Sequence, residues 1–175
     1  MNWFKKIAKT EYTSCIMADI SAKTSQEIKL YQKEIISEDI LVGQGFEEHI
    51  HITIKYGLAT DDVNLIKAFL KNEPPIKVKL GDIGFFKKNP DFDVVIVKVE
   101  SQDLENLNKR ISETFSHRDT YKGYTPHLTL AYVEKGKAAR FAGDKHFSGK
   151  EITIDQISFS SSIDDEPIRI KLRNK

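Results

Sequence analysis

The sequence predicts a mixed fold of strands and helices, α/β or α+β, rather than a doubly wound parallel sheet. Several segments alternate apolar and polar residues with the period of a half-buried strand, and three others carry apolar residues at helical spacing. The two kinds of segment follow one another in an irregular order. The chain has 175 residues, 39% of them hydrophobic, which suits one domain over residues 1–175 or two closely packed half-domains.

The expected strands are short and rich in Ile, Val and Thr. They cover residues 12–20, 49–56, 76–86, 92–100, 125–133, 151–160 and 167–172. The clearest is 49–56, where Ile50, Ile52 and Ile54 alternate with polar residues, so that one face of the strand is apolar and the other polar. Gly57 ends this strand, and Asn89-Pro90 marks a turn between two later strands.

Three helices are expected between these strands. Ser25 offers an N-cap for the first helix, which ends before the polar segment that holds two glycines. Thr60 or Asp61 caps the second helix, and Pro74-Pro75 terminates it because proline cannot continue a helix. The third helix spans 102–116.

Composition excludes several function classes. Charged residues make up 30% of the chain, but the net charge is only +1, so we expect no long nucleic acid as a partner, since such binders need a basic excess. Cys15 is the only cysteine, which excludes an intramolecular disulfide and a cysteine metal cluster and fits a reducing, cytoplasmic compartment. No apolar run is long enough to span a membrane, and the basic, aromatic start Met1–Ile7 does not form a signal peptide. No membrane partner is expected.

One short motif occurs twice. His51-Ile52-Thr53 and His127-Leu128-Thr129 both lie within expected strands, each with an apolar opposite face. Because residues i and i+2 of a strand point the same way, each motif presents one imidazole and one hydroxyl on one face. The matching contexts indicate a diverged duplication. Two such units related by a pseudo-twofold axis would bring both motifs to one cleft.

This set of side chains suits the cleavage of a phosphodiester bond. One histidine takes a proton from the attacking hydroxyl or water, and the other gives a proton to the leaving oxygen. Thr53 and Thr129 supply hydroxyl donors for the charge that develops on the phosphoryl oxygens. The alternative is that either histidine has a structural role and takes no part in catalysis. A metal site, with His49 beside His51, is a further alternative, but threonine is a poor ligand and no His-Glu-x-x-His helix is present.

The two motifs resemble those of the 2H phosphoesterase superfamily, in which His, a hydrophobic residue, Thr or Ser and a second hydrophobic residue occur twice. The resemblance implies an α+β, bilobal, pseudo-twofold fold with two antiparallel sheets lining a central cleft and helices outside. It also implies metal-independent catalysis without a cofactor. Softer similarities, in residues 12–17, 49–57, 92–99 and 124–133, resemble the phage anti-CBASS nucleases, which degrade the cyclic oligonucleotide signals of bacterial defence.

The resemblance implies roles for individual residues. His51 and His127 become general acid and base in an undetermined order, and Thr53 and Thr129 hold the phosphate. The candidate substrate-binding residues, each with packing or surface placement as the alternative, are Tyr12, Lys55, Phe85, Phe86 and Glu166. Aromatic residues among them would stack on nucleobases, and Lys55 shares the expected polar face of His51. Tyr56 and Tyr132 are expected to pack rather than bind.

The leading functional prediction is hydrolysis of 3′-5′ bonds in cyclic di- or trinucleotide immune signals, as a counter-defence activity. The first alternative is an RNA-end enzyme that acts on 2′,3′-cyclic phosphates or 2′-5′-linked RNA. The second is a non-catalytic protein that binds a cyclic nucleotide, although such a protein needs no matched acid and base. The sequence leaves the bases, ring size and linkage of the substrate open, together with the oligomeric state.

Overall fold

The computed structural model describes residues 12–164 and 166–173, so the segment Met1–Ile7 lies outside the described residues. The strands are β1 (Ser14–Asp19), β2 (Leu41–Phe46), β3 (His51–Leu58), β4 (Ile76–Phe86), β5 (Phe92–Glu100), β6 (His127–Glu134), β7 (Glu151–Ile154), β8 (Gln156–Ser160) and β9 (Ile168–Lys171). The helices are α1 (Ala22–Ile35), α2 (Val63–Leu70) and α3 (Gln102–Thr114), with 3-10 turns η2 (Glu38–Ile40) and η3 (Ala138–Phe141).

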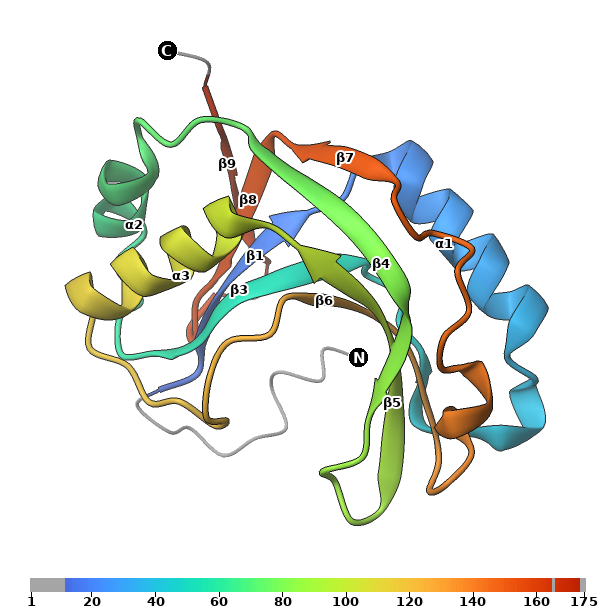
Figure 1. The fold of residues 1–175 in the computed structure, drawn as a ribbon. Coiled ribbons are helices and arrows are strands. Elements are labelled where there is room, and N and C mark those ends of the chain that lie inside the picture. The colour runs from blue at the N-terminus through green and yellow to red at the C-terminus, as the bar shows by residue number, and fades with distance from the viewer. Residues whose placement is uncertain (1–11, 165, 174–175) are drawn as a thin grey trace.

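The nine strands form one curled sheet in the order β7-β4-β5-β6-β3-β1-β8-β9, and β2 pairs with β6 off this path (Figure 1). The order is symmetric about the junction of β6 and β3, so β5 corresponds to β1 and β4 to β8. We call β1, β3 and β8 the first half and β5, β6 and β4 the second half. The halves meet through one antiparallel pair, Ile52 with Leu128. This pair joins the two expected sheets into one.

Both central strands carry a β-bulge at the same place. In the first half, Met17 pairs with Thr53 but Ile16 pairs with Lys55. In the second half, Ile96 pairs with Thr129 but Val95 pairs with Ala131. Each strand thus inserts one extra residue directly after its His-x-Thr motif, which reverses the facing of the residues that follow. The duplication inferred from the motifs therefore extends to the backbone.

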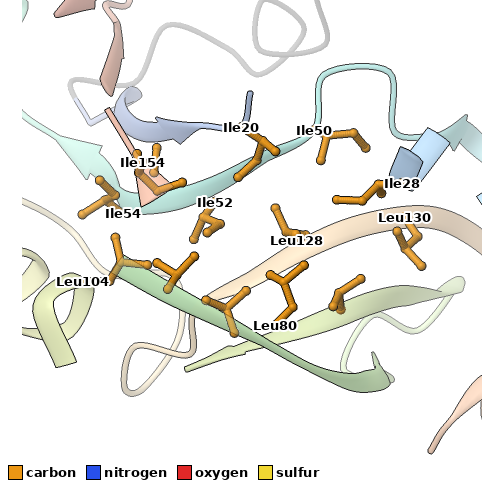
Figure 2. Close-up of a cluster of buried hydrophobic side chains, with 14 of the residues drawn as sticks. Ile20, Ile28, Ile50, Ile52, Ile54, Leu80, Leu104, Leu128, Leu130 and Ile154 are labelled. Carbon is orange, nitrogen blue, oxygen red and sulfur yellow. The ribbon is translucent and has the colours of Figure 1, made fainter. Parts of the chain in front are cut away.

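A single hydrophobic cluster fills the space between the sheet and the helices. Ile52 and Leu128 are fully buried near its centre (Figure 2). The helices add Ile28 of α1, Ile66 of α2 and Leu104 of α3 to the same cluster. Since the residue between His and Thr anchors each motif in this core, the polar residues of both motifs point to the opposite face of the sheet.

Some boundaries differ from those expected. Ser21, not Ser25, caps α1, because its hydroxyl accepts the backbone N–H of Thr24. Asp62, rather than Thr60 or Asp61, caps α2 through the N–H groups of Asn64 and Leu65.

The strand expected at 151–160 is interrupted at Asp155. The segment with Gly43 and Gly45 forms β2, where both glycines have positive φ. Such irregular backbone hides the strand from a period-two pattern. Within the described residues, no helix is long and apolar enough to cross a membrane.

Candidate active site

The two motif histidines have the same side-chain geometry. Nδ1 of His51 lies 2.6 Å from the backbone oxygen of His49, and Nδ1 of His127 lies 2.7 Å from that of Thr125. A carbonyl oxygen can only accept, so Nδ1 carries the proton in both neutral rings. Nε2 of each ring is then available to take or give a proton. The same tautomer is thus fixed twice by the residue two positions upstream.

The register places the motifs opposite one another. Ile52 pairs with Leu128 in an antiparallel ladder, and continuing this ladder by one residue sets His51 opposite Thr129 and Thr53 opposite His127. By this extension of the one observed pair, each imidazole lies across from the threonine of the other strand. A phosphate over this junction would meet one histidine and one threonine from each side.

Burial controls the proton affinity of both rings. Desolvation lowers the pKa of His51 below its ordinary value, while the carbonyl of His49 and the charge of Asp19 oppose this shift. Desolvation also lowers the pKa of His127, the carbonyl of Thr125 opposes that, and the nearby charge of His51 lowers it further. Because protonation of one ring disfavours protonation of the other, the pair suits one acid and one base.

Asp19 lies beside His51 and was not singled out by the sequence. The two residues pair across β1 and β3, so their side chains share a face. One oxygen of Asp19, Oδ2, accepts hydrogen bonds from Gln156 at 2.7 Å and Ser158 at 2.6 Å. The ring of His49 stacks on His51 with centroids 5.2 Å apart. In the sequence, Asp19 is only a carboxylate at the end of an apolar strand. Its place beside His51 becomes evident once the pairing of β1 with β3 is known.

Lys98 and Phe86 lie beside His127. Lys98 pairs with His127 across β5 and β6, and the ring of Phe86 meets that of His127 edge-on, with centroids 4.8 Å apart. Of the predicted substrate-binding residues, Phe86 is thus brought into contact with a motif histidine. The second motif therefore has one aromatic neighbour, Phe86, and one exposed cationic neighbour, Lys98.

Lys55 does not stand beside the histidines, contrary to the expectation from strict alternation. The bulge opposite Ile16 turns Lys55 toward the helix side, where its side chain is 5% exposed. Its ammonium lies 2.6 Å from a carboxylate oxygen of Asp119. Lys55 is therefore engaged in an ion pair with the loop before β6 and not directed at a bound phosphate.

The same bulges reverse the facing expected for Tyr56 and Tyr132. Each lies beyond the extra residue of its strand, pairing with Cys15 and Val94 respectively, and neither belongs to the hydrophobic cluster. Both tyrosines therefore lie on the face that carries the His-x-Thr motifs, where the ring of Tyr132 packs edge-on against that of Phe92. They are aromatic candidates for substrate contact that a simple strand period assigns to the wrong side.

The remaining predicted residues lie farther from the histidines. Phe85 packs against the hydrophobic cluster. Tyr12 precedes β1, and Glu166 lies exposed before β9; both are at the end of β1 opposite to Asp19 and His51. Contact of Tyr12 or Glu166 with a substrate stays a prediction for a ligand that extends along β1 and β3.

No group of three or more His, Cys, Asp or Glu side chains that could hold a metal ion occurs in residues 12–164 and 166–173. A surface hollow of about 470 Å³ lies elsewhere, between Pro74-Pro75 and α3. Because it contains neither motif, we assign the site from the paired histidines and not from surface volume.

The chain is similar in sequence to known proteins. The sequence model of the 2′-5′ RNA ligase superfamily matches residues 25–166. An RNA 2′,3′-cyclic phosphodiesterase of Methanocaldococcus jannaschii is 30% identical over 121 residues, which cover 66% of this chain and 68% of that protein.

Solved structures share the fold at low sequence identity. Escherichia coli LigT in its apo form superposes with a TM-score of 0.64 at 14% identity, covering 93% of this chain and 98% of that one. Kluyveromyces marxianus Usb1 gives a TM-score of 0.56 at 8% identity, with 92% and 98% covered. The matching family model and the related cyclic phosphodiesterase, on this shared fold, identify the chain as a phosphodiesterase, which is a hydrolase. The chain belongs to the 2′-5′ RNA ligase superfamily, whose members are 2H phosphoesterases.

Proposed function

We propose that the protein hydrolyses 2′,3′-cyclic phosphates at RNA ends. The observation that carries the proposal is the pair of histidines with matched tautomers, each with Nε2 available and each opposite the other motif's threonine in the continued register. The relative from Methanocaldococcus jannaschii is named for this activity. Escherichia coli LigT, which shares the fold, has been solved with phosphate and with 3′-AMP.

The reaction needs one proton acceptor and one proton donor. One histidine takes a proton from water as the water oxygen bonds to phosphorus. The bond from phosphorus to the 2′ or 3′ oxygen breaks, and the other histidine protonates that oxygen. Thr53 and Thr129 donate hydrogen bonds to the non-bridging oxygens as their charge grows. The products are a nucleotide monoester and two histidines with their protons exchanged, which bulk water restores.

A second candidate substrate is a cyclic di- or trinucleotide of bacterial immune signalling, cleaved at its 3′-5′ bonds. The resemblance to phage anti-CBASS nucleases motivates this candidate. Aromatic side chains occur on the catalytic face in both halves, with Tyr56 in one and Tyr132 and Phe86 in the other. They would allow a base to stack on each side of the scissile phosphate. The net charge of +1 favours a small ligand over a long polyanion. Under both candidate functions, we propose that the protein acts in the cytoplasm.

The test is a substrate panel in excess EDTA, read by mass spectrometry. It contains the four nucleoside 2′,3′-cyclic phosphates, an RNA oligonucleotide with a 2′,3′-cyclic end, a 2′-5′-linked dinucleotide, and cyclic di- and trinucleotides. We expect turnover of the 2′,3′-cyclic compounds, with none by the H51A variant as a matched control. Turnover of the cyclic oligonucleotides alone would select the second candidate. Intact recovery of every compound despite measurable binding would favour a binding protein instead.

Loss of all turnover in EDTA, with recovery on adding Mg²⁺ or Mn²⁺, would contradict metal independence.

A further inference from the structure

The two catalytic histidines have the same backbone environment but opposite charges next to them. Asp19 pairs with His51 across β1 and β3, and Lys98 pairs with His127 across β5 and β6. These two neighbours occupy corresponding positions in the two halves. Asp19 is a carboxylate and Lys98 is an ammonium. The two halves therefore share a backbone but carry opposite charges at the positions that can bias proton transfer.

Asp19 is built into its place. Gln156 and Ser158 of β8 both donate to its Oδ2, and Ser158 is itself buried. The other oxygen, Oδ1, is buried and has no hydrogen-bond partner among the described residues. It lies 3.8 Å from Nε2 of His49, whose ring stacks on His51. A buried carboxylate oxygen without a donor is costly unless a nearby positive charge compensates it.

Lys98 is held in a different way. Its aliphatic stem lies over β4 where that strand has two glycines: a Cβ added to Gly81 would lie 3.2 Å from Cβ of Lys98, and one added to Gly84 would lie 3.0 Å from Cε. The glycines therefore leave the space that the stem occupies. The side chain of Lys98 is exposed, so its charge acts through solvent and more weakly than that of Asp19.

We propose that Asp19 and Lys98 make the two histidines unequal: Asp19 is a positioning residue that favours His51 as the proton donor, and Lys98 favours His127 as the proton acceptor. A negative charge beside His51 stabilises its imidazolium. A positive charge beside His127 disfavours a second imidazolium, as does His51 once protonated. The inference rests on the phosphodiesterase chemistry proposed above, and it fixes the order of acid and base.

Other charged groups near the pair are Glu47 and His49, which lie in the bend before β3, and Arg169 on β9. Burial and the charge of His51 lower the pKa of His49, Asp19 and Glu47 oppose this shift, and Arg169 adds to it. His49 is exposed and can itself become protonated. When protonated it partly neutralises the charge of Asp19, and when neutral it leaves that charge to act on His51. Titrations must therefore follow His49, His51 and His127 separately.

The direct experiment is an NMR pH titration of these histidines, without substrate, in the wild type, D19N and K98M. For D19N we expect the midpoint of His51 to fall by about 1 pH unit, with little change at His127. For K98M we expect a rise of a few tenths of a unit at His127 only, since an exposed charge is screened. S158A is the control: it removes one hydrogen bond to Asp19 but keeps the charge of Asp19. The titration midpoint of His51 in S158A should stay close to that of the wild type.

The pH profile of kcat/KM gives the second readout. A proton donor sets the alkaline limb, because it must be protonated, and a proton acceptor sets the acidic limb. D19N should therefore move the alkaline limb to lower pH, and K98M should move the acidic limb slightly to higher pH. Unchanged His51 midpoints in D19N, or a shift of the acidic limb instead, would overturn the inference. Absence of turnover in the wild type would contradict the proposed function, while the NMR titration would still decide the role of Asp19.

Discussion

The first and second halves of the sheet share a backbone plan and differ in the side chains around it. In both, the His-x-Thr motif is followed by a bulge and then by a tyrosine on the catalytic face. The residue inserted by the bulge is apolar in both halves, Ile54 and Leu130, but the residue that follows it is a lysine in the first half, Lys55, and an alanine in the second, Ala131. Lys55 and Ala131 are both buried. Six residues after the histidine stands Gly57 in one half and Val133 in the other.

A duplicated unit can acquire asymmetric chemistry through the residues around a shared backbone. The repeated backbone aims two identical catalytic pairs at one phosphate, which in-line displacement requires. Hydrolysis also requires that one group begins protonated and the other not. That distinction comes from neighbours outside the motif, Asp19 and Lys98.

The largest effect is expected when either half loses its histidine. H51A and H127A should each lower kcat by about 10²–10⁴-fold, because each removes a general acid or base. The double variant should be little worse than the single ones, since the two groups act as a unit. Both side chains are only half-buried, so thermal unfolding should remain near that of the wild type. Steady-state kinetics and calorimetry check this, and additive losses would contradict the shared site.

Loss of a threonine should give a smaller defect that is similar in the two halves. T53V and T129V each remove one donor to the phosphoryl oxygens, which we expect to lower kcat by about 10²-fold. T53S and T129S retain the hydroxyl and should restore most of the rate. A defect confined to one half would show that the two threonines do not hold the phosphate symmetrically.

Gly57 marks a place where the first half tolerates no side chain. Its φ is +81°, and a Cβ would lie 2.2 Å from the backbone oxygen of Arg118. G57A should therefore lower the free energy of unfolding by about 2–3 kcal/mol. Gly123, with φ +84° and open space around it, is the matched control, and G123A should cost about 1 kcal/mol from backbone strain alone. Equal losses in urea unfolding would refute the steric explanation.

The smallest effect concerns Lys55. D119N leaves the buried ammonium of Lys55 without its partner and should destabilise the fold by about 1–2 kcal/mol, a modest value because Asp119 is 57% exposed. K55M, which makes this position apolar as in the second half, should stay within about 1 kcal/mol of the wild type. Its kcat should be unchanged. A large catalytic loss in K55M would restore the earlier expectation that this lysine attracts phosphate.

The sequence was sufficient for the catalytic motifs and most elements, because strand alternation around Ile52 and Leu128 fixes which face each His and Thr occupies. The strands 76–86 and 92–100 have the bounds expected from their Val and Ile content. Local patterns failed at the bulges, which reversed the facing of Lys55 and Tyr56, and at β2, where positive-φ glycines interrupt the period.

Asp19 and Lys98 could not be assigned from sequence for another reason. Their importance depends on which strands pair and in which register, and such long-range pairing leaves no trace in a local pattern. Asp19 lies 32 positions before His51 and Lys98 lies 29 before His127. An alignment of the two repeats on their His-x-Thr motifs places Asp19 and Lys98 at similar distances before the histidines. Such an alignment could have identified them as corresponding residues.

A change of leaving group distinguishes a histidine that donates a proton from one that accepts a proton. A 4-nitrophenyl phosphodiester releases a stable phenolate that needs no proton donor, unlike a ribose oxygen. Rates of H51A and H127A on this substrate are compared with those on a 2′,3′-cyclic phosphate. We predict that H51A recovers most of its lost rate on the nitrophenyl substrate and that H127A does not. Equal recovery, or recovery of H127A alone, would contradict the assigned roles.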